Sequence, residues 1–146
     1  ISLNEEINIK GKIYDGNNDP IIDAMIETWQ CDENGKYFNY QGFSRRVTDF
    51  KTGEYQLKTI RPGNQINEDG TISPSYILFW IVARGMNRPL ITRMYFDENE
   101  IKSDVMFKNL SIKDRLKTLI PYTEDKKNFV FDIHLQGKKE TIFFEF

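Results

Sequence analysis

The sequence has 146 residues, of which 39% are hydrophobic and 29% are charged, and its formal net charge is -2. A chain of this length can bury a core without disulfide or metal staples, so we expect a single domain over residues 1–146. The balanced, interspersed charges provide no electrostatic footprint for nucleic acid or for an anionic membrane surface.

Cysteine content and hydropathy narrow the class of protein further. Cys31 is the only cysteine, which excludes an intrachain disulfide and a multi-cysteine metal cluster and fits a reducing compartment. No apolar run reaches the length of about 18 residues that a transmembrane helix needs, and the first residues lack the pattern of a signal peptide. We therefore expect a soluble, cytoplasmic protein, and the start at Ile1 leaves open whether a segment precedes it.

Alternating apolar residues predict short strands through the first half of the chain. Residues 7–14 alternate in this way, and turn-forming residues at 15–20 separate them from a second run at 21–30. The two runs are expected to pair as a hairpin. A further strand starts at Tyr55 and stops before Pro62.

The stretch 75–96 is apolar on both faces of its first strand. Turn chemistry at 85–89 joins that strand to a second apolar run, which predicts a central hairpin. A strand of this kind needs a sheet over one face and another element or a partner chain over the other. The alternating sets are Ile77, Phe79 and Ile81 on one face, and Tyr76, Leu78, Trp80 and Val82 on the other.

The remaining residues predict a loop, one helix and two strands. Residues 62–74 have no periodicity and are expected to form an ordered surface loop. Capping-box spacing at Ser111 and Asp114, with Pro121 after the apolar run, predicts one short helix near 111–120. Strands are expected at 129–136 and 141–146. About seven short strands and one helix predict an all-β fold, a two-sheet antiparallel β-sandwich.

Candidate catalytic residues are scarce. His134 is the sole histidine, so one chain cannot build a site that needs two imidazoles, and we interpret it as a strand residue on a polar face. The neighbouring carboxylates Asp97 and Glu98 are interpreted as solvated turn residues. Glu27 lies between two large apolar residues, so it is either at a rim or paired with a cation. The residues alone assign no reaction.

Ordered motifs along nearly the whole chain from Gly11 carry a resemblance to a known family. They resemble the intradiol ring-cleavage dioxygenases, which implies an intradiol dioxygenase-like β-sandwich. The first motif also occurs in small transthyretin-like binding modules, so its order with the others carries the specificity. The motifs are Gly11-Lys-Ile-Tyr-Asp-Gly, Asp23-Ala-Met-Ile-Glu-Thr-Trp29, Gly42-Phe-Ser-Arg45, Gly53-Glu-Tyr55, Thr59-Ile-Arg-Pro62-Gly63, Val82-Ala-Arg84-Gly85, Thr92-Arg93-Met-Tyr95-Phe96 and Glu140-Thr-Ile-Phe-Phe144.

Within this family the chain is similar to alpha subunits of protocatechuate 3,4-dioxygenases. The resemblance places Tyr76 and Leu78 where catalytic subunits have the two histidines that bind ferric iron. Asn64 follows the Pro-Gly turn where catalytic subunits have a ligand tyrosine, and Tyr37 or Tyr40 would lie near the other ligand tyrosine. We therefore expect no metal, no cofactor and no catalytic residue in this chain, with ferric iron held by a partner beta subunit.

The resemblance implies a role in O2-dependent intradiol cleavage of a catechol carboxylate such as protocatechuate to 3-carboxymuconate. It implies that Arg84 binds the substrate carboxylate at the subunit interface, with Arg45 and Arg93 as weaker candidates; the alternative is that Arg84 pairs with a local acid. The isolated chain is expected to be inactive. Two other hypotheses are a transthyretin-like binding module without catalytic activity and a self-sufficient iron dioxygenase, which the single histidine disfavours.

Overall fold

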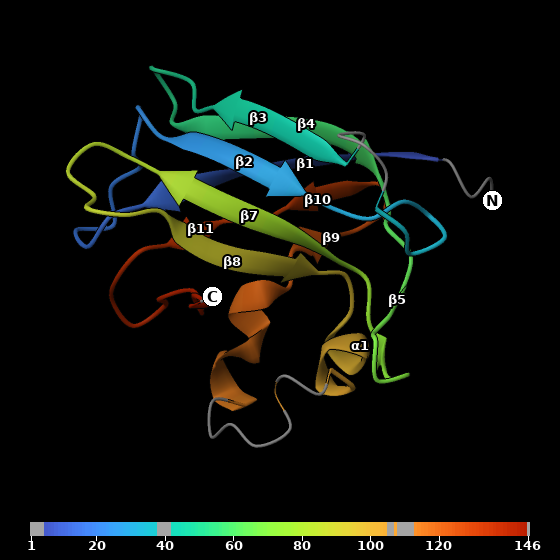
Figure 1. The fold of residues 1–146 in the computed structure, drawn as a ribbon. Coiled ribbons are helices and arrows are strands. Elements are labelled where there is room, and N and C mark those ends of the chain that lie inside the picture. The colour runs from blue at the N-terminus through green and yellow to red at the C-terminus, as the bar shows by residue number, and fades with distance from the viewer. Residues whose placement is uncertain (1–4, 38–41, 105–106, 108–112, 146) are drawn as a thin grey trace.

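The computed structural model describes residues 5–37, 42–104, 107 and 113–145, and these fold into two packed β-sheets with helical segments along one side (Figure 1). The strands are β1 (Glu6–Tyr14), β2 (Met25–Trp29), β3 (Phe43–Val47), β4 (Glu54–Ile60), β5 (Gln65–Ile66), β6 (Ile72–Ser73), β7 (Tyr76–Val82), β8 (Leu90–Tyr95), β9 (Tyr122–Thr123), β10 (Asn128–Val130) and β11 (Ile133–His134).

The two sheets have different internal order. One sheet follows the order β11-β1-β10-β9, with β4 paired to the other side of β1, and the second follows β3-β2-β7-β8. The two-sheet sandwich of the sequence prediction is thus confirmed. It is not purely antiparallel, because β1 pairs in parallel with both β10 and β11. The apolar faces of the two sheets meet in one core of buried side chains.

The predicted hairpin between 7–14 and 21–30 is wrong. β1 and β2 lie in different sheets. The contacts between the two runs near the turn are an isolated bridge between Tyr14 and Pro20 and a hydrogen bond from the Ile21 N–H to the Ile13 carbonyl at 2.7 Å. The turn is organised by Asp15, whose side chain accepts hydrogen bonds from the backbone N–H groups of Asn17 and Asp19 at 2.9 and 3.0 Å. Period-2 patterns cannot tell strands that face each other across a core from strands that pair edge to edge.

The central hairpin is confirmed as β7 and β8, which pair from Tyr76–Tyr95 to Ile81–Leu90. The inner face of β7, with Ile77, Phe79 and Ile81, is fully buried between the sheets. Its outer face is only partly covered, and the Trp80 side chain is 37% exposed. The second cover that this strand needs is therefore incomplete in the part of the chain that the structure describes.

Two helical segments pack beside β8 and form a second, smaller core. The predicted helix near 111–120 is a 3-10 helix, η2 (Lys113–Leu119), and Ser111 lies outside the described residues. A short α-helix, α1 (Glu98–Lys102), begins where the sequence indicated solvated turn residues, because the Asp97 side chain caps it by accepting from the Asn99 N–H at 2.7 Å. No helix among the described residues has the length and apolarity to cross a membrane.

Two further segments differ from the sequence prediction. The expected loop at 62–74 contains the small hairpin β5–β6. The expected strand at 141–146 forms only a bridge between Phe144 and Ile91, and a hydrogen bond from the Thr92 hydroxyl to the Ile142 carbonyl at 2.8 Å holds it along β8. Residue 146 lies outside the described residues.

The turn between β9 and β10 is held by one carboxylate. Asp125 accepts from the backbone N–H groups of Lys127 and Asn128 at 2.9 and 2.8 Å and from the Asn128 amide at 2.8 Å. The hydrogen bonds from Asn128 contribute most to lowering the pKa of Asp125, to about 2. These bonds favour the ionised form, so the carboxylate stabilises the folded chain most when it is charged.

We expect acid to weaken this turn with a defined pH dependence. Because the folded pKa of Asp125 is depressed, its contribution is fully present above the ordinary aspartate pKa and is lost as the pH falls through about 2. Urea unfolding between about pH 5 and pH 2 should show a smaller loss of stability in Asp125→Asn than in the parent chain. Equal pH dependence in the two proteins would contradict this assignment.

Candidate functional site

The positions expected for metal-binding histidines lie on the outer face of β7. Tyr76 and Leu78 both point away from the core between the sheets, and each has a direct neighbour on β8. Tyr95 lies opposite Tyr76, and Arg93 lies opposite Leu78. The hairpin register therefore brings an arginine to the place where the family resemblance would put metal ligands.

Arg93 is enclosed by aromatic rings. Its side chain is 11% exposed, and its guanidinium carbon lies 4.2 Å from the Tyr76 ring centroid and 5.2 Å from that of Phe144. Rings at these distances attract a cation through the negative charge density of their faces. The positive charge of Arg93 therefore has a preformed place on this face of the sheet.

Asp104 supplies the balancing negative charge. Nη1 of Arg93 donates to the Tyr95 hydroxyl at 3.1 Å and lies 3.8 Å from Oδ2 of Asp104, which is 2% exposed. The Tyr95 hydroxyl donates in turn to Asp104 at 2.8 Å. Burial raises the pKa of Tyr95 against the opposing effect of Arg93, so this phenol stays protonated and links the two charges.

Tyr37 approaches the same face from the loop after β2. Its hydroxyl accepts a hydrogen bond from the Gln65 amide at 3.2 Å, and the residue is 54% exposed. This places Tyr37 in the neighbourhood that the resemblance indicated for a ligand tyrosine. Tyr40, the other candidate, lies outside the described residues.

These side chains do not fit a ferric ion. The Tyr95 hydroxyl is engaged between the Arg93 guanidinium and the Asp104 carboxylate. Leu78 has no donor atom, and the charge of Arg93 would repel a metal cation. Over the ranges that the structure describes, no group of three or more His, Cys, Asp or Glu side chains could hold a metal ion.

Arg84 lies at the opposite end of β7 from these residues. It follows Leu78 by six positions, which corresponds to roughly 20 Å along an extended strand. Its side chain is 88% exposed, and its Nε lies 3.3 Å from Oδ2 of Asp23. The structure therefore does not bring Arg84 together with Tyr76, and an exposed ion pair of this kind leaves the cation available. Its role in substrate binding stays a prediction.

The other residues singled out from the sequence have structural partners. Arg45 donates to the Glu27 carboxylate at 2.6 Å, so Glu27 is paired with a cation, as one of the two interpretations expected. His134 is half-buried and stacks on the Tyr14 ring with centroids 4.8 Å apart. Cys31 is buried and donates to the Gly63 carbonyl at 3.3 Å.

Sequence reasoning missed the network around Arg93. Asp104 and Phe144 lie outside the hairpin that contains Arg93, and their positions relative to β8 depend on how α1, η2 and the last residues pack. The only available signal was the pairing register of β7 and β8, which puts Arg93 opposite Leu78 once the hairpin turn is fixed.

Comparison with known proteins agrees with this fold. A protein-family model described as a dioxygenase matches residues 2–137. The alpha chain of protocatechuate 3,4-dioxygenase from Pseudomonas putida is 36% identical over 155 residues, which cover 97% of this chain and 77% of the relative. The beta chain of protocatechuate 3,4-dioxygenase from Burkholderia cepacia is 28% identical over 160 residues, which cover 95% of this chain and 68% of the relative.

Solved structures share the fold at lower identity. The 3-chlorocatechol 1,2-dioxygenase of Rhodococcus opacus 1CP has a TM-score of 0.71 and 21% identity, over 90% of this chain and 59% of that chain. The dioxygenase domain of a carbohydrate-binding fusion from Streptomyces sp. SirexAA-E has a TM-score of 0.69 and 19% identity, over 94% and 80% of the two chains. The chain belongs to the intradiol ring-cleavage dioxygenase family.

Proposed function

We propose that this chain is an alpha-type subunit of a protocatechuate 3,4-dioxygenase-like complex and that a beta-type partner carries the ferric iron. The observation that carries the proposal is Arg93, a buried cation on the face where the family resemblance puts metal ligands. The 36% identity to a protocatechuate 3,4-dioxygenase alpha chain supports the same role. In this proposal O2-dependent ring opening to 3-carboxymuconate takes place at the partner's iron.

The outer face of the sheet β3-β2-β7-β8 is the surface we propose for the partner. Trp80 is 37% exposed and Val47 is 69% exposed on this face, and the Glu27–Arg45 ion pair lies on the same face beside Trp80. Burying large apolar side chains against a second chain is the usual way in which obligate interfaces are stabilised. Aromatic residues such as Trp80 are enriched among those that carry most of the binding energy.

Arg84 would act beside the partner's active site. Just beyond the end of β7 it presents a cation whose ion pair with Asp23 is exposed. A guanidinium can bind the carboxylate of a catechol acid with two parallel hydrogen bonds, which would orient the substrate. This chain would then contribute binding and orientation, while the partner's iron supplies the oxygen chemistry.

Co-expression with a beta-type subunit from the same source tests the proposal. We expect the two chains to purify together, iron to be present only with the partner, and protocatechuate cleavage to require both. Trp80→Lys should abolish copurification, because it places a charge in the buried centre of the interface. Phe50→Lys is the matched control, since Phe50 is 77% exposed in the turn between β3 and β4, outside this face.

Two outcomes would overturn the proposal. If the isolated chain contains stoichiometric iron and cleaves protocatechuate by itself, it is a self-sufficient dioxygenase. If the two chains do not associate and the chain is a well-behaved monomer, a transthyretin-like binding module is the better interpretation.

A further inference from the structure

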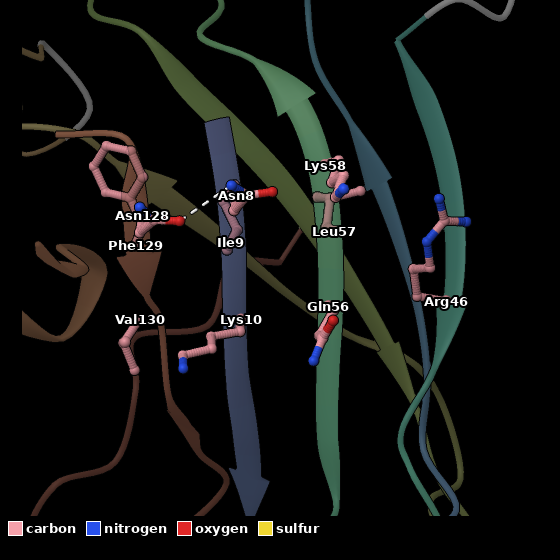
Figure 2. A pocket seen from close by; sticks show the side chains of 10 residues that line it. All are labelled: Asn8, Ile9, Lys10, Arg46, Gln56, Leu57, Lys58, Asn128, Phe129 and Val130. Carbon is pink, nitrogen blue, oxygen red and sulfur yellow. Dashed lines mark hydrogen bonds between the residues drawn. The ribbon is translucent and has the colours of Figure 1, made fainter. Parts of the chain in front are cut away.

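A hollow of about 500 Å³ lies on the other side of the molecule, on the face formed by β1, β4 and β10 (Figure 2). The strand register puts two rows of side chains side by side on this face. Lys58, Asn8 and Asn128 form one row, and Gln56, Lys10 and Val130 form the next. Arg46 reaches the hollow from β3. This volume is within the usual range for small-molecule sites.

The charged side chains that line the hollow are all cations. Lys10, Lys58 and Arg46 line it, and no carboxylate does. Throughout the described part of the chain, none of these three cations takes part in an ion pair, whereas Arg45 beside Arg46 is paired with Glu27. Three cations that line one concave surface repel one another, and a bound anion would relieve that repulsion.

Carboxamides complete the polar lining of the hollow, and acids at its edges limit the size of the ligand. Asn8 donates to Asn128 at 3.1 Å, and this pair crosses the hollow between β1 and β10. The acids at its edges are held by neighbouring amides: Glu54 accepts from Gln56 at 3.1 Å and Asp125 accepts from Asn128 at 2.8 Å. Negative charge at both edges disfavours a long polyanion such as nucleic acid and leaves room for a compact one.

We propose that this hollow binds a small organic anion with two or more carboxylates. Lys10 and Lys58 are diagonal neighbours, with Cα atoms roughly 7–8 Å apart, and Arg46 adds a planar donor that can bind a carboxylate with two hydrogen bonds. A single carboxylate cannot satisfy three cations spread in this way, whereas a di- or tricarboxylate can contact them together. Val130 provides an apolar surface for the carbon skeleton.

Titrating small anions into the intact chain, together with any partner that copurifies, tests the site. The measurement is made in about 0.15 M salt, which screens weak electrostatic interactions at the surface. The probes are citrate, cis,cis-muconate and inorganic phosphate. We expect saturable binding of both carboxylates at one site, with amide shifts in an NMR spectrum confined to β1, β4, β10 and Arg46. Phosphate should bind at least ten-fold more weakly, because it cannot span the three cations.

The double variant Lys10→Gln and Lys58→Gln should weaken citrate binding by ten-fold or more, since each lost charge-assisted hydrogen bond is costly. Lys102→Gln removes an exposed cation from α1 and should leave binding unchanged. Equal binding by the double variant and this control, equal affinity for phosphate, or shifts spread over the surface would each overturn the proposal. The measurement uses binding alone, so its result is independent of ring cleavage.

Discussion

Replacing Arg93 with methionine is expected to destabilise the chain by about 3 kcal/mol or more, because it removes one partner of a buried ion pair. Asp104 is 2% exposed and would lose the guanidinium that lies 3.8 Å from its Oδ2, while it would keep the hydrogen bond from the Tyr95 hydroxyl. The rings of Tyr76 and Phe144 would lose the cation that lies over them. Methionine fills most of the volume of the arginine side chain, so the change in stability reports on the lost charge more than on lost packing.

Chemical denaturation measures this effect, and Arg84→Met is its control. Arg84 also pairs with an aspartate, but its side chain is 88% exposed, so the change should be within about 0.5 kcal/mol. Adding Asp104→Asn to Arg93→Met should recover part of the loss, since the buried carboxylate that faced the guanidinium is then replaced by a neutral amide. If Arg93→Met is as stable as the parent chain, the network around Arg93 does not hold this face together.

The second large effect is expected from Gly11→Ala. A methyl group at this position on β1 would overlap the backbone carbonyl of Phe131, which also accepts the hydrogen bond of the buried Tyr55 hydroxyl. The backbone of β1 would have to separate from the strand segment that it pairs with. We expect a loss of about 3 kcal/mol, at the upper end of ordinary overpacking effects, because the clash is with backbone that cannot rotate away.

Gly16→Ala tests whether the loss of stability expected from Gly11→Ala comes from the close contact at Gly11 or from replacing any glycine. At Gly16 the new methyl would meet only the end of the Gln136 side chain, which can move. The substitution also reduces the freedom of the unfolded chain, so stability should change little or rise by about 0.4–1 kcal/mol. Similar losses at both positions, measured by thermal unfolding, would show that the close approach at Gly11 is not the cause.

Local patterns were sufficient where neighbouring residues decide the structure. The alternation in 75–96 and the turn at 85–89 predicted the central hairpin, since both its strands and its turn lie within one stretch. Local patterns failed where the packing of segments distant in the sequence decides the structure. The period-2 pattern of β1 is equally compatible with pairing to β2 or to β4, and only the packing of the whole sandwich selects β4.

The same limit applies to the candidate site. The family resemblance, together with the residue types at Tyr76 and Leu78, led to the expectation that two ligand histidines are missing. What replaces them could not be predicted, because Arg93 reaches Asp104 and Phe144 only after α1 and the last residues have packed against β8. The Asp97 cap of α1 was missed for a different reason. Its helix has five residues, too few to show a helical period.

The parallel pairing of β1 with β10 and β11 also determines when the domain can form. Residues 8–10 and 13–14 lie next to 128–130 and 133–134, so β1 completes its sheet only with strands that follow it 120 residues later in the chain. Contacts of such long sequence separation slow folding, because a long loop must close before they form. Until then β1 has an unpaired edge, which is the kind of edge that recruits other chains during synthesis.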